Sequence, residues 1–414
     1  MAVEAFPVMK LYSSPLRNWL FGIQLFMQLS KFKRFSNILD ARAKKILMIF
    51  WLSGLVIGGC YAALIGFYRH GWKGVAPEEL NSGTTTFFTV LVPARNEAAH
   101  LPQLLEALLA QQYPAECFEV LVLDDHSSDG TAAIAEAAGG NVRVLRLPPG
   151  VEGKKAAITQ GVNAAHGPWI VTTDADCLPG PLWLRHFAAS SERAAFVAAP
   201  VRYQHLRTLC DRFQALDFLT LQGITAASVA SGFHSMCNGA NLAYSKEAFL
   251  EAGGFAGIDH VASGDDLLLM HKIALRHPGK IHYRMHPDAI VDTDPAPGWR
   301  AFWKQRVRWA SKSAQYDDKR IFGALLLVYA FNLWFVVTAI ASFWDAARLL
   351  PLLLLLVLKT IVELRFLAPV ARFFGQAHLL KWFPWMQPLH ILYTVFVGAL
   401  SQVGKYEWKG RKVR

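Results

Sequence analysis

The sequence predicts an α/β domain with a mostly parallel sheet, flanked by apolar helices of membrane-spanning length. Short apolar runs alternate with helical patterns from Thr86 to Thr173, which is typical of a parallel sheet covered on both faces. Carboxylate-rich loops follow several of these runs. Outside this stretch lie three uncharged runs of 23, 24 and 23 residues, Ile46–Tyr68, Ile321–Trp344 and Trp382–Gly404. Each is long enough to cross a hydrocarbon core of ~30 Å.

The N-terminal part is basic and then apolar. Residues 1–45 carry eight basic and two acidic residues, and we expect a basic segment that holds an interfacial helix. An alternative is that translation starts at Met48 and that the preceding residues extend the reading frame. Residues 46–68 form the first predicted transmembrane helix, since the run is too long and starts too late for a signal peptide.

The soluble part, residues 86–315, contains four predicted strands. They are Thr86–Val92, Phe118–Leu123, Val142–Leu147 and Trp169–Thr173, and a helix is predicted over Lys154–Ala165. In such sheets ligands bind beyond the carboxyl ends of the strands. The segments that follow three of these strands, Pro93–Glu97 and the loops that begin at Asp124 and Asp174, are therefore predicted to meet at one edge.

The C-terminal part, residues 321–404, is predicted to hold two to three spans. Leu349–Ala371 contains Lys359, Glu363 and Arg365, so it either spans or lies in the interface. Residues 405–414 form a basic tail.

Charge and cysteine usage narrow the class of protein. The net charge is +11, but the basic residues flank the apolar runs, which favours lipid or a phosphorylated substrate over nucleic acid. The five cysteines are scattered without a Cys-x-x-Cys pair. A disulfide framework or a zinc site is therefore not expected, and a reducing compartment is the simple reading.

Two motifs at strand ends fit a nucleotide diphosphate. Asp174-Ala175-Asp176 offers hard oxygen ligands for magnesium or manganese, although aspartate is also common in turns. Gly153-Lys154-Lys155 precedes a helix, where a cation and free backbone N–H groups favour phosphate; the alternative is a solvated basic turn. Asp125 lies in a loop that either caps the next helix or points at a ligand.

Two further motifs lie nearer the second apolar run. Gly264-Asp265-Asp266 opens a predicted helix, where a carboxylate either favours the helix dipole or acts as a general base. Gln305-Arg306-Val307-Arg308-Trp309 is either an interfacial aromatic-basic belt or part of a site. Each motif is ambiguous alone.

Taken in order, these motifs resemble the family-2 inverting glycosyltransferases. The resemblance covers Thr86 to Trp309 and is closest to the membrane-bound branch with ceramide glucosyltransferases and the cellulose and hyaluronan synthases. It implies the Rossmann-like GT-A fold, a nucleotide-sugar donor and a magnesium or manganese ion. Arg95 stands where many members have tyrosine, and Asp265 where glutamate is frequent, which leaves the base-stacking partner open.

The resemblance also implies residue roles. Asp266 is the expected base, Arg308 counters the charge of the leaving diphosphate, and Trp309 floors the acceptor site. Asp176 is the expected metal ligand. Acceptor-side positions are Asn238, Gly239, Asp265 and Gln305. The nucleotide sugar is expected to contact Pro93, Arg95, Glu97, Asp125, Lys154, Asp174 and Asp176.

Location and acceptor follow from the flanks. Arg69 and Lys73 follow the first run and several basic residues precede the second, which predicts a multi-pass protein of the cell inner (plasma) membrane with its catalytic domain in the cytoplasm. A cytoplasmic tail requires an even number of later spans, so either Leu349–Ala371 or the last run is not a full crossing.

The predicted function is transfer of a sugar, from a UDP-sugar in the first place, to a membrane lipid. Phe213, Leu216, Leu219 and Leu221 either contact this lipid or belong to an ordinary core. One alternative is a processive polysaccharide synthase, and another is a non-catalytic sugar-nucleotide sensor or scaffold. The donor sugar, the acceptor and the oligomeric state stay open.

Overall fold

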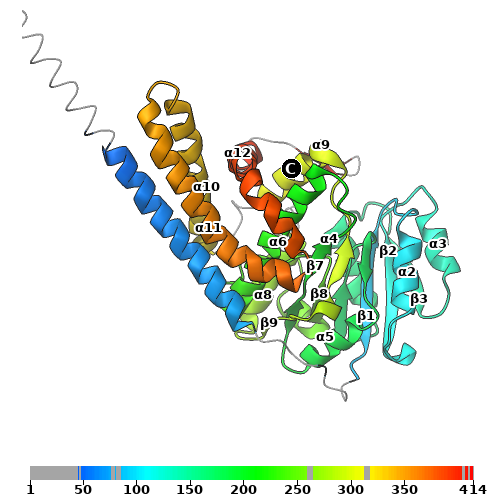
Figure 1. Ribbon diagram of the computed structural model, residues 1–414. Coiled ribbons are helices and arrows are strands. Elements are labelled where there is room, and N and C mark those ends of the chain that lie inside the picture. Colours follow the sequence, from blue (N-terminus) through cyan, green and yellow to red (C-terminus); the bar gives the residue numbers. More distant parts are fainter. Residues whose placement is uncertain are drawn as a thin grey trace, which may run out of the picture. The chain divides into compact units, whose positions relative to one another are not determined.

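A computed structural model describes residues 45, 48–75, 80, 85–258, 264–311, 318–402, 406–408 and 411–413. The chain divides into two compact units, Met1–Ile57 and Gly58–Arg414. The second unit contains the sheet and almost all described helices (Figure 1). The predicted basic segment lies outside the described residues apart from Lys45, as do the side chains of the basic tail.

The second unit is built on a seven-stranded sheet of order β3-β2-β1-β4-β8-β6-β9. Strands β1 to β4 are mutually parallel, as the alternating pattern predicted. The strands are β1 Phe88–Ala94, β2 Phe118–Asp124, β3 Val142–Arg146, β4 Trp169–Thr172, β6 Phe196–Ala198, β8 Leu242–Ser245 and β9 Ile281–Tyr283.

Strand β1 runs two residues further than the predicted Val92, through Pro93 to Ala94. Its pairing with β4 ends at Leu91, while its pairing with β2 continues to Ala94. Beyond Leu91 the strand therefore has one neighbour only. A proline is tolerated where no second strand needs its N–H, so Pro93 stands at the end of the sheet, beside the loops that follow β2 and β4.

The other half of the sheet is not parallel throughout. Strand β8 pairs antiparallel with both β4 and β6, and β9 pairs parallel with β6. A second, three-stranded sheet has the order β5-β10-β7, with β5 Cys177–Pro179, β7 Val201–Tyr203 and β10 Val291–Thr293. Strands β5, β6, β7, β9 and β10 have three residues each, which is too short a pattern to be predicted.

Helices connect and cover these strands. They are α2 Leu101–Leu109, α3 Thr131–Ala137, α4 Lys154–Ala164, α5 Trp183–Ser191, α7 Lys246–Glu251 and α8 Asp265–Arg276, with short 3₁₀ turns η1 Ala115–Cys117 and η2 Pro287–Ala289. Helix α2 buries Leu101, Leu104, Leu105 and Leu108, which is the spacing of an amphipathic helix packed on a sheet. The central strands β1, β2 and β4 are buried on both faces.

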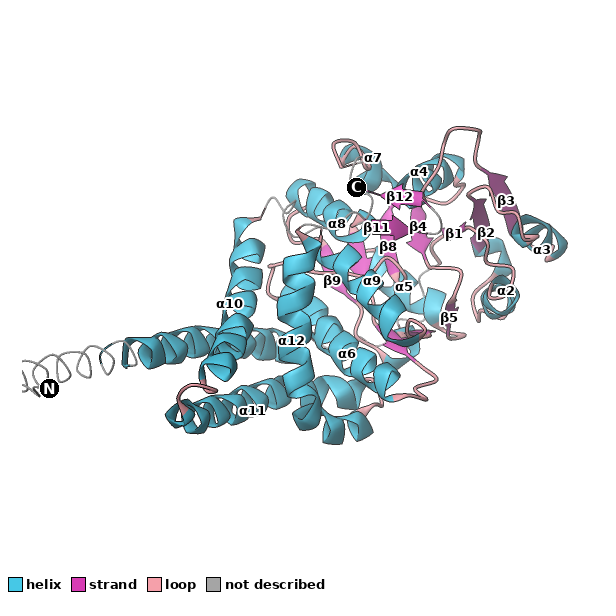
Figure 2. Cartoon of the chain, turned by 90° about the horizontal axis from the view of Figure 1, so that it is seen from above, coloured by secondary structure: helices cyan, strands magenta, loops and turns pink. Residues whose placement is uncertain are grey.

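A second group of helices stands on one side of this sheet in both views (Figures 1 and 2). It comprises α6 Leu209–Ala230, α9 Gly298–Ala310, α10 Lys319–Ala341, α11 Leu349–Phe373 and α12 Phe383–Ser401, with 3₁₀ turns η4 Ala346–Arg348 and η5 Ala377–Trp382. The hairpin β11 Tyr406–Trp408 and β12 Arg411–Val413 ends the described chain.

Two described helices are long and apolar enough to cross a membrane, Met48–Gly74 and Lys319–Ala341. Within their apolar windows 17% and 28% of residues are buried, whereas a core helix of a soluble protein is mostly buried. Helices α11 and α12 do not meet the same criterion. Helix α11 contains Lys359, Glu363 and Arg365, and α12 contains two prolines and His390.

Gly161 allows α4 to lie close to β1 and β2. A Cβ atom at this position would approach side-chain carbons of Leu91 and Leu123 to 2.9 Å. We expect Gly161→Leu to destabilise the fold by about 1–3 kcal/mol, because overpacking a close-packed core forces neighbours out of their rotamers. Thermal unfolding measures this. The control Gly66→Leu, on an open helix surface, should change the melting temperature little, and equal losses in both variants would contradict the interpretation.

Candidate active site

Every residue to which the resemblance gives a role lines one cavity of about 430 Å³ at the carboxyl end of the parallel strands. The structure thus brings together segments more than 200 residues apart in sequence, from Pro93 to Trp309. The residues that were given a role and that line the cavity are Pro93, Arg95, Glu97, Asp125, Lys154, Asp174, Asp176, Asn238, Gly239, Asp265, Asp266, Gln305, Arg308 and Trp309.

Asp125 lies at one end of the cavity, directly after β2. Its carboxylate accepts a hydrogen bond from the Gly153 N–H at 3.1 Å. The guanidinium of Arg95 donates to the Asp125 carbonyl oxygen at 2.9 Å and lies 3.8 Å from a carboxylate oxygen. Asp125 is almost fully buried, so these contacts fix its position where the loops after β1 and β2 meet the start of α4.

Lys154 lies between two carboxylates from different parts of the fold. Its Nζ is 2.6 Å from Asp174 at the end of β4 and 3.7 Å from Asp265 at the start of α8. Burial alone would lower the pKa of Lys154, but Asp174 and then Asp265 raise it well above its usual range. The ammonium is therefore charged at neutral pH and joins the parallel strands to α8.

The carboxylate of Asp176 lies near two other carboxylates, those of Asp174 and Glu97. Solvent reaches its side chain through the cavity, yet protein lies on most sides. This burial, then Asp174 and Glu97, raises the pKa of Asp176 above its ordinary value. Three carboxylates with a shortage of positive charge are a suitable environment for a divalent cation, which prefers oxygen ligands.

The carboxylate of Asp266 faces the loop that leads into β8. Oδ2 accepts from the Gly239 N–H at 3.1 Å, and Oδ1 accepts from the Leu267 N–H at 2.8 Å. A Cβ at Gly239 would lie 3.1 Å from the Nζ of Lys154 and 3.6 Å from Asp265. Glycine therefore lets the loop backbone lie close to Lys154, whose ammonium would have to shift slightly to admit a Cβ.

The remaining wall comes from helices. Gln305, Arg308 and Trp309 reach the cavity from α9. Lining residues that the motifs did not indicate are Ala157, Phe218, Leu221, Gln222, Thr225, Met236, Cys237 and Leu267. Of the apolar residues suggested for lipid contact, Leu221 alone lines the cavity. Phe213, Leu216 and Leu219 are buried in the core, because they lie on another face of α6.

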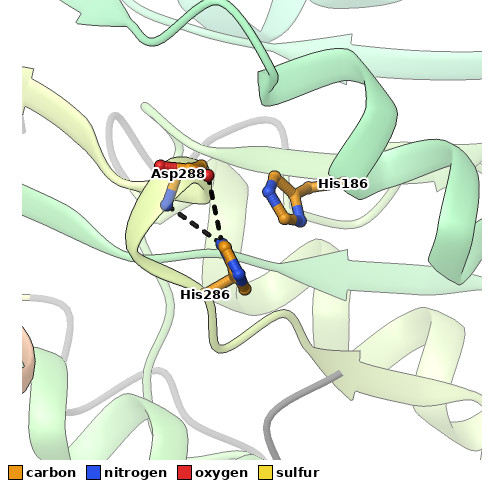
Figure 3. Close-up of side chains that lie close together, drawn as sticks. All are labelled: His186, His286 and Asp288. Atoms are coloured by element: carbon orange, nitrogen blue, oxygen red, sulfur yellow. Dashed lines mark hydrogen bonds and ion pairs between the residues drawn. The ribbon is translucent and has the colours of Figure 1, made fainter. Parts of the chain in front are cut away.

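A second cluster, His186, His286 and Asp288, has ligand atoms within 4.8 Å of one another (Figure 3). It does not suit a metal ion. The Nε of Arg284, a buried residue, donates to His186 Nδ1 at 3.2 Å, so a cation would meet a positive charge at low dielectric constant. The two imidazole rings stack with centroids 4.2 Å apart. Burial, then Arg284 and His286, lowers the pKa of His186 to about 3, which fits a neutral structural histidine.

Comparison with known proteins identifies the domain. Residues 89–251 match the glycosyl transferase family 2. The structure superimposes on a mannosyltransferase of Pyrobaculum calidifontis, determined with GDP-Man and Mn²⁺, with a TM-score of 0.53 and 21% identity, covering 82% of this chain and 98% of the other. Residues 89–251 therefore form a family 2 glycosyltransferase domain with a GT-A-like fold, a domain of glycosyltransferase enzymes.

The names of curated relatives agree with such a domain, and those names that give a product give different ones. A probable glycosyltransferase of Bacillus subtilis is 27% identical over 54% of this chain and 54% of its own. A poly-beta-1,6-N-acetyl-D-glucosamine synthase of Staphylococcus aureus is 22% identical over 56% of each chain. A beta-monoglucosyldiacylglycerol synthase of Trichormus variabilis is 30% identical over 37% of this chain and 34% of its own. The chain spans about half the length of the first two relatives.

The raised pKa of Asp176 gives a prediction about stability. A carboxyl whose pKa is raised by folding holds its proton more tightly in the folded state, so the folded protein loses stability as the pH rises from the unfolded value of ~3.9 through the folded one. We expect Asp176→Asn to melt at a higher temperature than the wild type at pH 7. The difference should shrink as the pH falls toward about 4. Melting curves that coincide at pH 7 would contradict it.

Proposed function

We propose that this protein is an inverting glycosyltransferase that moves a sugar from a nucleotide sugar, with UDP-sugars as first candidates, to a lipid acceptor at a membrane. One observation carries the proposal: a single cavity joins the carboxylates at the ends of β2 and β4 to Asp266 and to Arg308 and Trp309. The relatives reported above support the reaction type.

The donor half follows from the strand ends. Asp125, held by the Gly153 N–H and Arg95, is an acceptor for the N–H group of a nucleobase. The start of α4 and the Lys154 ammonium favour the diphosphate. Once the donor is present, Lys154 exchanges part of its contact with Asp174 for phosphate oxygens.

A divalent metal ion fits beside Asp176, with Asp174 and Glu97 close enough to contribute charge. When bound, magnesium or manganese stabilises the negative charge that develops on the leaving diphosphate. Arg308, which lines the same cavity, adds a fixed positive charge for the same purpose.

Asp266 is the proposed general base. Two backbone N–H groups hold its carboxylate in place, so it can accept the proton of an acceptor hydroxyl without reorientation. That hydroxyl oxygen then attacks the anomeric carbon as the bond to the diphosphate breaks. A single displacement of this kind inverts the anomeric centre.

The membrane assignment rests on the helix group. We propose that Met48–Gly74, α10 and α11 cross the inner membrane and that the catalytic domain faces the cytoplasm. Arg202 on β7 donates to the Phe374 carbonyl oxygen at 3.1 Å, so the end of α11 returns to the catalytic domain. In the turn between α10 and α11, Phe343 and Trp344 are 89% and 82% exposed, as expected of aromatic residues at an interface.

The charges inside α11 do not argue against a crossing. Lys359 is buried, and its Nζ lies 2.7 Å from a carboxylate oxygen of Glu363 and 2.8 Å from the side-chain oxygen of Gln387. Charged residues within membranes are tolerated when they are paired with one another. With α10 and α11 as two spans and α12 as a non-crossing helix, the tail returns to the cytoplasmic side.

A processive polysaccharide synthase is the second candidate, favoured by the likeness to the Staphylococcus aureus enzyme. Such an enzyme must pass a growing chain across the membrane, which needs several helices around a channel. Two of the described helices meet the length and hydropathy criterion for a membrane span. Transfer to a lipid acceptor at the membrane does not require the helices to enclose a channel.

The first experiment on this proposal is a product assay. Membranes that contain the full chain are incubated with radiolabelled UDP-glucose, UDP-galactose or UDP-N-acetylglucosamine in the presence of diacylglycerol or ceramide. We expect one labelled lipid that carries a single sugar. Labelled polymer that stays at the origin after lipid extraction would favour the polysaccharide synthase instead.

Asp266→Asn tests the base. We expect transfer to fall by ~10²–10⁴, the usual contribution of a positioned general base, while the dissociation constant of the UDP-sugar stays the same. Asp288→Asn, outside the cavity, is the matched control. Normal turnover in the Asp266→Asn variant would show that Asp266 is not the general base.

Metal binding has a readout that does not need activity. Manganese or magnesium should raise the melting temperature of the wild type, since a ligand that binds the folded state alone stabilises it. Asp176→Asn should lose most of this shift. A shift of equal size in the variant would place the ion elsewhere.

A further inference from the structure

Arg306 stands inside the Gln305–Trp309 motif but does not line the cavity. It is 2% exposed, and its Nε and terminal nitrogen each lie 2.8 Å from one carboxylate oxygen of Asp217 on α6. Its guanidinium also covers the ring of Trp309, with 4.2 Å from the guanidinium carbon to the ring centroid. Helix α9 is thus attached to α6 through a buried ion pair beside the cavity.

Helix α12 completes this cluster. His390 Nε2 lies 3.7 Å from the other carboxylate oxygen of Asp217. The hydroxyl groups of Tyr393 and of Tyr203 on β7 lie close to the Arg306 guanidinium. The Tyr393 ring stacks on Phe302 of α9 with centroids 5.2 Å apart. Three helices and one strand therefore meet at a single guanidinium.

A buried ion pair of this kind is a poor source of stability. Desolvation offsets most of the attraction, and apolar residues of the same volume often give a more stable fold. What such a pair does provide is a defined geometry, because both partners accept few other arrangements. Here the ion pair fixes how α9 packs against α6. These two helices supply Trp309, Phe218 and Leu221 to the cavity.

We propose that Arg306 is a positioning residue for the acceptor side of the site: its ion pair with Asp217 and its stacking on Trp309, supported by His390 and Tyr393 of α12, fix the indole that faces the acceptor. The inference rests on the proposed function, since it takes Trp309 as part of the acceptor site. It makes α12 a support of the active site.

The geometry separates this role from donor binding. Arg306 contacts Trp309 on one face of the indole, and Phe218 lies 6.3 Å away, ring to ring, from α6. The groups proposed for the nucleotide, around Asp125 and Lys154, are held by the loops after β1, β2 and β4. Loss of Arg306 should therefore move the acceptor without moving the donor, and a misplacement of about 1 Å can cost ~10²-fold in rate.

Two variants test the proposal in the full chain. Arg306→Lys keeps the charge but loses the planar group that stacks on the indole. The double variant Asp217→Asn with Arg306→Gln replaces the ion pair by a neutral, hydrogen-bonding pair, which avoids an unpaired buried charge. The probes are the UDP-sugar that the wild type uses and vesicles of phosphatidylcholine that contain diacylglycerol or ceramide.

The expected result is a split between the two substrates. The acceptor KM should rise at least about tenfold, or acceptor transfer fall by as much. The dissociation constant of the UDP-sugar and its slow hydrolysis by water should stay within about twofold of the wild type. A purely structural role would instead lower donor binding, hydrolysis and transfer together with the melting temperature, and this outcome overturns the proposal.

The matched control is the pair Arg143 and Glu119, at the amino end of the strands. Arg143 also places Nε and a terminal nitrogen on one carboxylate oxygen, at 2.9 Å and 2.7 Å. Arg143→Gln with Glu119→Gln should leave the acceptor KM unchanged. If the wild type transfers sugar to lipid and the Arg306 variants keep its acceptor KM, this inference alone fails. If the wild type transfers to no lipid with any donor, the proposed function fails and this inference falls with it.

Discussion

The contact of Lys154 with Asp174 and Asp265 is the interaction on which the rest of the site depends. Six acidic residues line the cavity against three basic ones, and unscreened like charges at such distances would repel one another. Lys154 opposes this repulsion at the point where the parallel strands meet α8, and Gly239 lets the loop before β8 approach the same ammonium. On the proposed function, a metal ion and a diphosphate would bring further charge of both signs, and these side chains would then pair differently than in the empty cavity.

The parallel half of the fold was predictable because it is periodic. Four apolar runs became β1 to β4 with ends shifted by at most two residues, and their common direction places the following loops at one edge. The antiparallel strand β8 and the three-stranded sheet were not predictable. Their strands have three or four residues and are held by partners far away in the chain, such as Asn241, which donates to the carbonyl oxygens of Pro200 and Ala289. No local pattern encodes such contacts.

The same distinction holds within the site. Residues that follow strands, such as Asp125 and Asp174, were assigned to the cavity from position alone. The helix α6 was harder, because its apolar residues repeat all round and do not show which face meets the cavity; the structure buries Phe213 in the core and turns Phe218 inward. A signal was present in Asp217, the one acid of α6 beyond its first turn. Its partner Arg306 lies 89 residues away, beyond what a pattern can pair.

The two halves of the cavity therefore have different origins. The family match ends at residue 251, after the strands and loops that would hold the donor, whereas α8, α9 and α12 lie beyond it. On the proposed function, the acceptor side is built from α6, α9 and the helices packed behind them, and Arg306 joins the Gln305–Trp309 motif to α12. On the proposed function, acceptor choice depends on helices on both sides of that limit, because α6 lies within the matched residues while α9 and α12 lie beyond them.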